Sequence, residues 1–360
     1  MSFYRKIIRP AFFSLPAETA HEIGIKTLKF GLTSEYLQNL TSKHYHSVDY
    51  GEIERFGLKF ANPLGVAAGF DKNAVIINQL ASMGFGFVEV GTVTYEPQPG
   101  NSKPRLFRLP EDKALINRLG FNNEGAVAIA ERLKNHDRKC IVGVNIGRNK
   151  DVPNGEATEN YLKCFEVIHG VADYVAVNIS SPNTPNLREL QQAEGFAELI
   201  GALQKRNTEL GSKPLLVKIA PDLNEGEIEA IVEIALSYEL SGVIATNTTI
   251  SRNGLVTKDI DQLGVGGLSG KPLTKRSTEV ISTIFRYSKG KLPIIGVGGI
   301  FSAEDAFEKI AAGASLIQAY TGFVYDGPKF ARDINSGLAA ILSERGFKTL
   351  DEAVGYANKD

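Results

Sequence analysis

Apolar runs recur along the chain from about residue 60, and each is followed by glycine, asparagine or threonine and then by a segment of helical periodicity. Continuous apolar runs are typical of strands in a parallel sheet that is buried on both faces. Amphipathic stretches between the runs predict helices, for example at 126–134, 196–206 and 225–240. The runs predict eight strands, at 64–67, 87–90, 141–145, 174–178, 215–219, 242–245, 293–297 and 315–319.

Eight alternations of strand and helix predict an α/β protein of the (β/α)8 TIM-barrel type. In that fold the active-site loops follow the carboxyl ends of the strands. The competing fold, a doubly wound open sheet, would require a G-x-G-x-x-G turn after an early strand. The early runs of this chain are not followed by such a turn. We therefore predict a closed barrel.

Two segments depart from the repeat. Residues 49–61 alternate with a period of two around Gly57, which predicts a small β-hairpin that caps the barrel. Residues 1–40 interleave aromatic and aliphatic side chains with basic ones, and Pro16 then opens a stretch of helical spacing. This pattern predicts two short amphipathic helices. From periodicity alone they could pack on the barrel or rest on a bilayer.

Composition narrows the possible partners. The chain has 360 residues, 43% of them hydrophobic, and a formal net charge of −1. Nucleic acid is excluded as the main partner, because a phosphate backbone attracts a basic surplus. The apolar runs are all shorter than the roughly 18 residues that a membrane-spanning helix needs.

The run 174–178 leads directly into a polar loop that contains Ser181, Asn183 and two prolines. The loop has no histidine, cysteine or carboxylate, which excludes a metal site or a simple acid pair there. The pattern indicates hydrogen bonding to a flat polar ligand, with Ser181 as the only candidate base or nucleophile. We expect no metal.

Other strand ends carry compatible chemistry. The segments 296–299 and 319–322, which contain glycine, end the last two strands, where barrels of this type often bind phosphate. This signal suggests FMN or a phosphorylated substrate without distinguishing them. Lys72 and Lys218 end two other strands and predict an anionic ligand. Amides and hydroxyls that match the edges of a planar heterocycle such as a pyrimidine occur at Thr92, Asn117, Asn122, Asn145, Asn178, Asn183, Thr246, Asn247 and Thr248.

With these residues in place, the chain resembles the quinone-dependent (class 2) dihydroorotate dehydrogenases over essentially its whole length. The resemblance rests on the motifs Ala-Gly-Phe-Asp-Lys72, Asn117-Arg-Leu-Gly-Phe121, Asn178-Ile-Ser-Ser-Pro-Asn183, Thr246-Asn-Thr-Thr249 and Gly-Val-Gly-Gly299. It implies oxidation of (S)-dihydroorotate to orotate in pyrimidine biosynthesis, with FMN taking the hydride and passing electrons to a membrane quinone. It also implies that Ser181 is the catalytic base; the soluble class 1 enzymes have cysteine there.

The resemblance assigns further residues by position. The substrate contacts it implies are Lys72, Asn117, Arg118, Leu119, Gly120, Phe121, Asn178, Asn183, Asn247 and Thr248. The FMN contacts it implies are Ala68, Gly69, Phe70, Asp71, Lys72, Thr92, Asn145, Asn178, Lys218, Thr246, Gly270, Gly299, Tyr320 and Thr321. The quinone tunnel it implies is lined by His21, Arg108 and Tyr325.

The resemblance also favours the bilayer interpretation of the N-terminus. Residues 1–45 would form a region for membrane association and quinone access, and residues 46–360 the FMN-binding barrel. We expect a monomer, attached peripherally to the cytoplasmic face of the cell membrane, that uses ubiquinone or menaquinone. Asn186 and Ala74 stand where the family often has glycine, and asparagine tolerates left-handed backbone best among the other residues.

Two alternatives remain from the sequence. One is a soluble class 1 enzyme that uses fumarate or NAD, against which Ser181 speaks. The other is a phosphate-binding barrel that acts as an isomerase or lyase on a sugar phosphate. It would explain the glycine loops but neither the amide cluster nor the long N-terminus.

Overall fold

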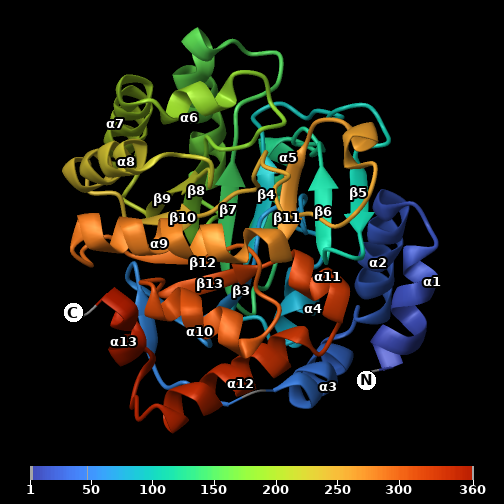
Figure 1. Ribbon diagram of the computed structural model, residues 1–360. Helices are drawn as coiled ribbons and strands as arrows, with labels where there is room; N and C mark the ends of the chain where they lie inside the picture. The colour runs from blue at the N-terminus through green and yellow to red at the C-terminus, as the bar shows by residue number, and fades with distance from the viewer. Residues whose placement is uncertain (1–2, 47, 359–360) are drawn as a thin grey trace.

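The computed structural model describes residues 3–46 and 48–358, and its centre is a closed barrel of eight parallel strands (Figure 1). The strands are β3 (Leu64–Val66), β4 (Phe87–Val93), β7 (Ile141–Ile146), β8 (Tyr174–Asn178), β9 (Leu215–Ile219), β10 (Gly242–Ala245), β12 (Ile294–Val297) and β13 (Leu316–Ala319). Around the barrel they follow the order β10-β12-β13-β3-β4-β7-β8-β9. All eight predicted strands are present, so the predicted (β/α)8 barrel is confirmed.

Helices surround the barrel and connect its strands (Figure 1). They are α4 (Ile77–Ser82), α5 (Ala126–Lys134), α6 (Ala157–His169), α7 (Ala193–Glu209), α8 (Glu225–Ser237), α9 (Thr274–Ser288), α10 (Ala303–Ala311), α11 (Thr321–Asp326), α12 (Phe330–Glu344) and α13 (Leu350–Ala353). Short 3₁₀ turns are η2 (Asn154–Glu156), η3 (Leu187–Gln191), η4 (Ile260–Leu263), η5 (Lys271–Leu273) and η6 (Tyr356–Asn358). Local sequence explains several helix starts: Ser302 and Asp305 form a capping box at α10, as do Asn224 and Glu227 at α8.

The predicted hairpin is confirmed as β1 (Ile53–Arg55) paired antiparallel with β2 (Leu58–Phe60). Phe60 packs edge-on against Phe87, the first residue of β4. A Cβ on Gly242, the first residue of β10, would lie 2.9 Å from the ring of Phe56. The hairpin therefore covers the amino-terminal end of the barrel and leaves the carboxyl end to the functional loops.

A second small sheet was not predicted from the sequence. It is antiparallel, has the order β11-β6-β5, and comprises β5 (Leu106–Leu109), β6 (Ala114–Asn117) and β11 (Gly267–Gly270). Its strands have only four residues each, and Leu268 pairs with Ile116, far away in the sequence. Periodicity is a weak signal in such short segments. This sheet stands at one side of the barrel, next to the N-terminal helices (Figure 1).

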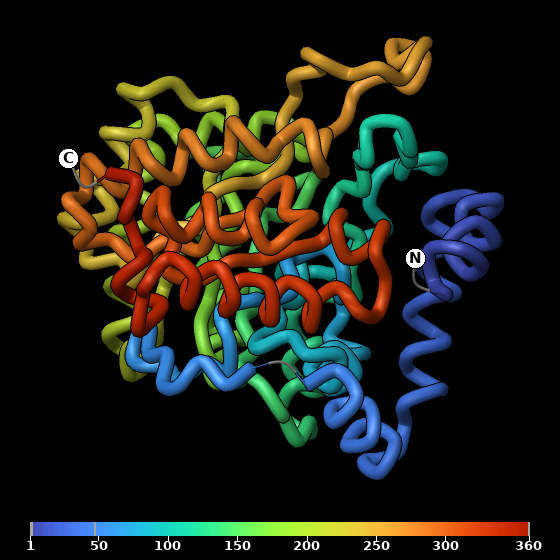
Figure 2. The backbone as a smooth tube through the Cα atoms, turned by 60° about the horizontal axis from the view of Figure 1, so that its bottom comes forward, coloured from blue at the N-terminus to red at the C-terminus, as the bar shows by residue number. Residues whose placement is uncertain are grey.

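The predicted N-terminal helical extension is present and has one more helix than expected. It consists of a π-helical turn η1 (Tyr4–Ile8), α1 (Arg9–Phe13), α2 (Ala17–Gly31) and α3 (Glu35–Tyr45). Figure 2 shows the first two helices at the edge of the molecule, alongside rather than inside the barrel. A bidentate ion pair from Arg105 to Glu18 holds α2 against the start of β5, with Nη2 and Oε1 2.8 Å apart. None of the helices in the described ranges has the length and hydropathy to cross a membrane.

Candidate active site

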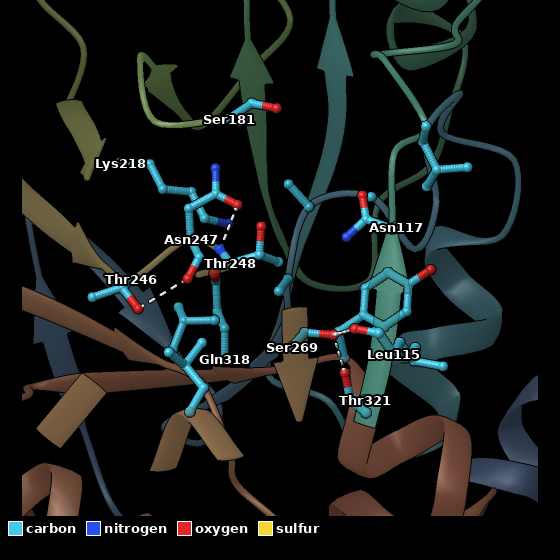
Figure 3. Close-up of a pocket in the computed structure, with 18 of the residues that line it drawn as sticks. Leu115, Asn117, Ser181, Lys218, Thr246, Asn247, Thr248, Ser269, Gln318 and Thr321 are labelled. Carbon is cyan, nitrogen blue, oxygen red and sulfur yellow. Dashed lines mark hydrogen bonds between the residues drawn. The ribbon is translucent and has the colours of Figure 1, made fainter. Parts of the chain in front are cut away.

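A polar cavity opens at the carboxyl ends of the barrel strands, where the sequence placed the site. Figure 3 shows strand-end residues of the barrel on one side and residues of β6 and β11 facing them on the other. The cavity is thus bounded partly by the sheet that the sequence did not predict. Of the predicted site residues, it is lined by Ala68, Gly69, Lys72, Thr92, Asn117, Leu119, Gly120, Phe121, Asn178, Ser181, Asn183, Lys218, Thr246, Asn247, Thr248, Gly270, Gly299, Tyr320 and Thr321.

Ser181 lies on the loop after β8 and is only 5% exposed, at the wall of this cavity. Its Oγ accepts one hydrogen bond, from the backbone N–H of Asn183 at 3.2 Å. Further along the loop, Asn186 has φ 56°, in the left-handed region that asparagine tolerates. Asparagine at this position thus adopts the left-handed backbone expected of it. The loop therefore presents to a ligand in the cavity a hydroxyl group that is almost inaccessible to solvent.

Four side chains from neighbouring strand ends form one hydrogen-bonded cluster. The Nδ2 of Asn178 donates to Thr92 Oγ1 at 3.0 Å and to Asn145 Oδ1 at 3.1 Å. Asn247 Nδ2 donates to Asn178 Oδ1 at 3.2 Å. Each amide is oriented by its neighbour, so the polar edge offered to a ligand is preorganised.

A second amide pair spans the cavity mouth. Asn183 Nδ2 donates to Asn117 Oδ1 at 3.1 Å, which joins the Ser181 loop to the end of β6. Asn117 Nδ2 in turn points toward the carbonyl of Gly267 on β11 at 3.4 Å. The serine loop and the small sheet are thus fixed relative to each other on opposite sides of the cavity.

Two lysines give the cavity its positive charge. Burial lowers the pKa of Lys72 to about 8, although the carboxylate of Glu18 acts in the opposite direction. Lys218 Nζ lies 3.7 Å from Glu89 Oε1, and both side chains are buried inside the barrel. An anionic ligand near Lys72 would therefore favour the charged form of this lysine, which burial disfavours.

Glu89 was not predicted as a site residue. It is fully buried on β4 and accepts hydrogen bonds from Asn145 Nδ2 at 3.0 Å, Tyr174 OH at 3.0 Å and Gln318 Nε2 at 2.8 Å. Its contacts satisfy a carboxylate that would otherwise be costly to bury, and they place a counter-ion beside Lys218. The sequence feature that could have identified Glu89 is the presence of a carboxylate inside the apolar run 87–90.

Glycines that follow β12 line another part of the cavity. Gly298 and Gly299 have φ values of 127° and 72°, and a Cβ on Gly299 would lie 2.1 Å from Thr274 Oγ1. Only glycine fits such close backbone packing. Within the described residues, neither glycine N–H has a hydrogen-bond acceptor, and the buried Oε1 of Gln318, which also lines the cavity, has no donor. These groups suit a polar, phosphate-bearing ligand.

Four predicted contacts lie outside the lining. Asp71 accepts the N–H groups of Val75 and Ile76 and so shapes its own turn. Arg118 points outward, with Cζ 4.5 Å from the ring centre of Phe107. Asn145 does not line the cavity but accepts a hydrogen bond from Asn178, which does. Phe70 lines a second cavity.

The second cavity is apolar and lies between the N-terminal helices and the barrel. Its lining includes His21 and Arg108, as predicted for a quinone tunnel. Burial, followed by the charge of Lys72, lowers the pKa of His21 to about 3, so this ring is neutral at physiological pH. Arg108 Nη1 donates to the carbonyl of Phe12 at 2.8 Å, which fixes α1 at the edge of the cavity.

Tyr325 is not among the residues that line this cavity. Its hydroxyl donates to the carbonyls of Leu109 at 3.1 Å and Ala114 at 3.0 Å, and it is Tyr320 that lines the second cavity. Tyr325 instead packs edge-on against Phe13, which lines the cavity, and its role in the quinone tunnel stays a prediction.

The polar and apolar cavities share a wall. Leu106, Leu115 and Tyr320 line both of them. A ligand in the polar cavity would thus be separated from an apolar ligand by single side chains. This arrangement permits electrons to pass from one site to the other while the substrates remain apart.

Comparisons with known proteins agree on one family. The family model described as dihydroorotate dehydrogenase matches residues 52–342. Dihydroorotate dehydrogenase (quinone) from Christiangramia forsetii is 53% identical over 92% of this chain and 97% of the relative. The enzyme of that name from Gloeobacter violaceus is 50% identical over 99% of both chains. The crystal structure of DHODH from Eimeria tenella in complex with ferulenol has a TM-score of 0.82 at 37% identity, and the match covers 92% of this chain and 99% of that one.

Proposed function

The chain belongs to the quinone-dependent dihydroorotate dehydrogenases, and we propose that FMN, bound in the polar cavity, connects the two halves of its reaction. The enzyme oxidises dihydroorotate to orotate in pyrimidine biosynthesis and reduces a quinone. The wall shared by the polar and apolar cavities is the observation that carries the proposal. The soluble class 1 enzyme and the sugar-phosphate isomerase are disfavoured, because neither would need the apolar cavity.

The residues present fit FMN. The free N–H groups of Gly298 and Gly299 suit its phosphate, and the unpaired Oε1 of Gln318 suits a ring N–H. When bound, FMN supplies a two-electron acceptor that can also give electrons to a quinone. The proposed contacts with it are Ala68, Gly69, Thr92, Asn178, Lys218, Thr246, Gly270, Gly299, Tyr320 and Thr321, all of which line the cavity.

The protein's own groups would bind and deprotonate the substrate. The amides of Asn117, Asn183 and Asn247, with Thr248, offer donors and acceptors to the pyrimidine ring, and Lys72 would pair with its carboxylate. Ser181 would take the proton from substrate C5. Its low exposure and its single accepted hydrogen bond leave a lone pair of Oγ available for that proton.

The purified full-length protein is expected to be yellow, with about one FMN per chain, and to reduce ubiquinone or menaquinone when dihydroorotate is added. Visible absorption and steady-state assays with each quinone test this expectation, and the assays should be run with and without lipid vesicles. A colourless, well-folded protein that cannot be reconstituted with FMN would contradict the cofactor proposal.

The N-terminal region, residues 1–45, would admit the quinone and rest on the cytoplasmic face of the membrane, whereas residues 46–360 would form the catalytic barrel. Residues 1, 2, 47, 359 and 360 lie outside the described ranges. Support comes from large apolar side chains exposed on the extension, such as Ile7 at 56%, Phe30 at 71% and Leu40 at 55%. We propose peripheral attachment as a monomer.

Orotate binding should weaken as the pH rises above about 8. Lys72 has a pKa of about 8, so it loses its charge in that range and with it the attraction for the orotate carboxylate. Replacing Lys72 with Met should weaken orotate binding by about 2 kcal/mol, roughly thirtyfold, and remove this pH dependence. Titration of the holoenzyme with orotate, followed by flavin absorbance from pH 6 to 9, measures both effects.

Lys103→Met is the matched control for Lys72→Met, because Lys103 also lies near Glu18 but its side chain is 60% exposed. It should behave like the unmodified enzyme. Equal pH dependence in the Lys72 variant and the unmodified enzyme would remove Lys72 from this role.

A further inference from the structure

Lys309, on α10, is a buried cation that the proposed reaction leaves without a role. Its side chain has 0% exposure. Its Nζ donates to the carbonyl of Thr274 at 3.2 Å, to Ser277 Oγ at 3.2 Å and to Thr278 Oγ1 at 3.1 Å. All three acceptors are neutral oxygens in the first two turns of α9. Lysine is almost never fully buried unless an anion is paired with it.

The nearest acidic groups do not neutralise this charge. Asp305 uses Oδ1 to bind Lys271 Nζ at 2.7 Å and Oδ2 to cap the N–H groups of Phe301 and Ser302. Glu308 is exposed on the same helix. Within the described residues, Lys309 forms no ion pair with a carboxylate. Burial lowers its pKa to about 7, while Asp305 and Glu308 raise it and Lys271 lowers it further.

The acceptors of Lys309 connect it to the glycine turn of the polar cavity. Ser277 Oγ donates to the carbonyl of Val297 at 2.6 Å, and Thr274 Oγ1 donates to the carbonyl of Gly299 at 2.8 Å. Lys309 itself does not line the cavity. It therefore acts on the turn only through the first residues of α9.

We propose that Lys309 is a positioning residue that holds α9 against the glycine turn and supplies the positive charge that balances the phosphate of bound FMN. The inference rests on the proposed cofactor. It adds that FMN is bound together with a proton, which comes from solvent and resides on Nζ of Lys309. Riboflavin has the same ring but no phosphate and should bind without that proton.

The sign of the pH effect follows from linkage. A nearby phosphate favours the charged form of Lys309, so the pKa of this lysine is higher in the complex than in the free protein. The contribution of Lys309 to FMN affinity should then be constant at pH values below about 7 and fall as the pH rises above it. Each unit by which the phosphate raises this pKa corresponds to a tenfold loss of affinity.

The test follows flavin release from the full-length holoprotein between pH 6 and 9, measured by the recovery of flavin fluorescence. Lys309→Met should retain FMN about tenfold less well at pH 6 to 7 and show a flatter pH profile. The same variant loaded with riboflavin should release it like the unmodified protein. Lys275→Met is the matched control, because Lys275 lies in the first turn of α9, next to Thr274, but its side chain is 91% exposed.

A measurement on the unmodified chain keeps the proposal testable if the Lys309 variant does not fold. Calorimetry of flavin binding to the flavin-free chain, in buffers of different ionisation enthalpy, should show proton uptake at pH 7.5 for FMN and none for riboflavin. The second pKa of a phosphate is about 6, so its own ionisation would give release rather than uptake.

Equal FMN retention and equal pH profiles in Lys309→Met and the unmodified protein would overturn the proposal, as would equal proton uptake for FMN and riboflavin. A chain that binds riboflavin and FMN equally well would also overturn it while leaving a flavin site in place. Absence of flavin binding at every pH would instead overturn the cofactor proposal on which it rests.

Discussion

Replacing Ser181 with alanine is expected to slow reduction of the bound flavin by dihydroorotate at least about a hundredfold, the usual contribution of a positioned general base. The variant keeps the loop backbone, because within the described residues Oγ of Ser181 accepts a single hydrogen bond, from Asn183 N. FMN content and orotate affinity should therefore stay close to those of the unmodified enzyme. Anaerobic single-turnover reduction, followed at the flavin absorbance band, measures the rate without involving the quinone.

Ser180 supplies the control for this experiment, because it is the adjacent serine but does not line the cavity. It is fully buried, and its Oγ lies 3.2 Å from Asn178 Oδ1 and 3.0 Å from Asn247 Nδ2. Ser180→Ala should disturb these amides and weaken orotate binding, with a much smaller loss in the rate of flavin reduction. An unchanged single-turnover rate in Ser181→Ala would show that another group removes the proton.

Filling the apolar cavity is expected to stop the quinone half of the reaction and spare the dihydroorotate half. Gly24 lies on α2 and lines this cavity, and a Cβ there would meet only the ring of Phe12, at 3.7 Å. Gly24→Phe would place a ring where the quinone is proposed to bind. Overpacking of about 1–3 kcal/mol corresponds to a roughly five- to 150-fold loss in quinone turnover.

The matched control is Gly31→Phe, the same change on the same helix, because a Cβ at Gly31 would meet no heavy atom within 4 Å among the described residues beyond its own helix backbone and chain neighbours. Steady-state quinone reduction and single-turnover flavin reduction should be measured on both variants. We expect Gly24→Phe to lose the first and keep the second, whereas Gly31→Phe keeps both. Normal quinone turnover in a folded Gly24→Phe would place the quinone elsewhere.

The site residues that could be predicted stand directly after predicted strands. Lys72, Asn178 and Lys218 line the polar cavity because the carboxyl ends of parallel strands meet at one face of a barrel. Sequence order therefore fixes their neighbourhood once the strands are recognised. Arg118 and Asp71 lie within the same motifs, yet their side chains turn to other partners: Arg118 donates to the carbonyl of Val265, and Asp71 accepts the N–H of Val75. A motif gives the position of a residue in the chain but not the direction of its side chain.

By itself the sequence determined the barrel, the capping hairpin and the serine loop, because each is encoded by periodicity or turn chemistry within about ten neighbouring residues. Only the tertiary structure decided the rest. It paired Leu268 with Ile116, placed Glu89 beside Lys218, lined the second cavity with Tyr320 and brought Lys309 behind the glycine turn. These contacts join residues that are distant in sequence or depend on a side-chain direction. Tertiary packing determines these contacts, and no local sequence pattern predicts them.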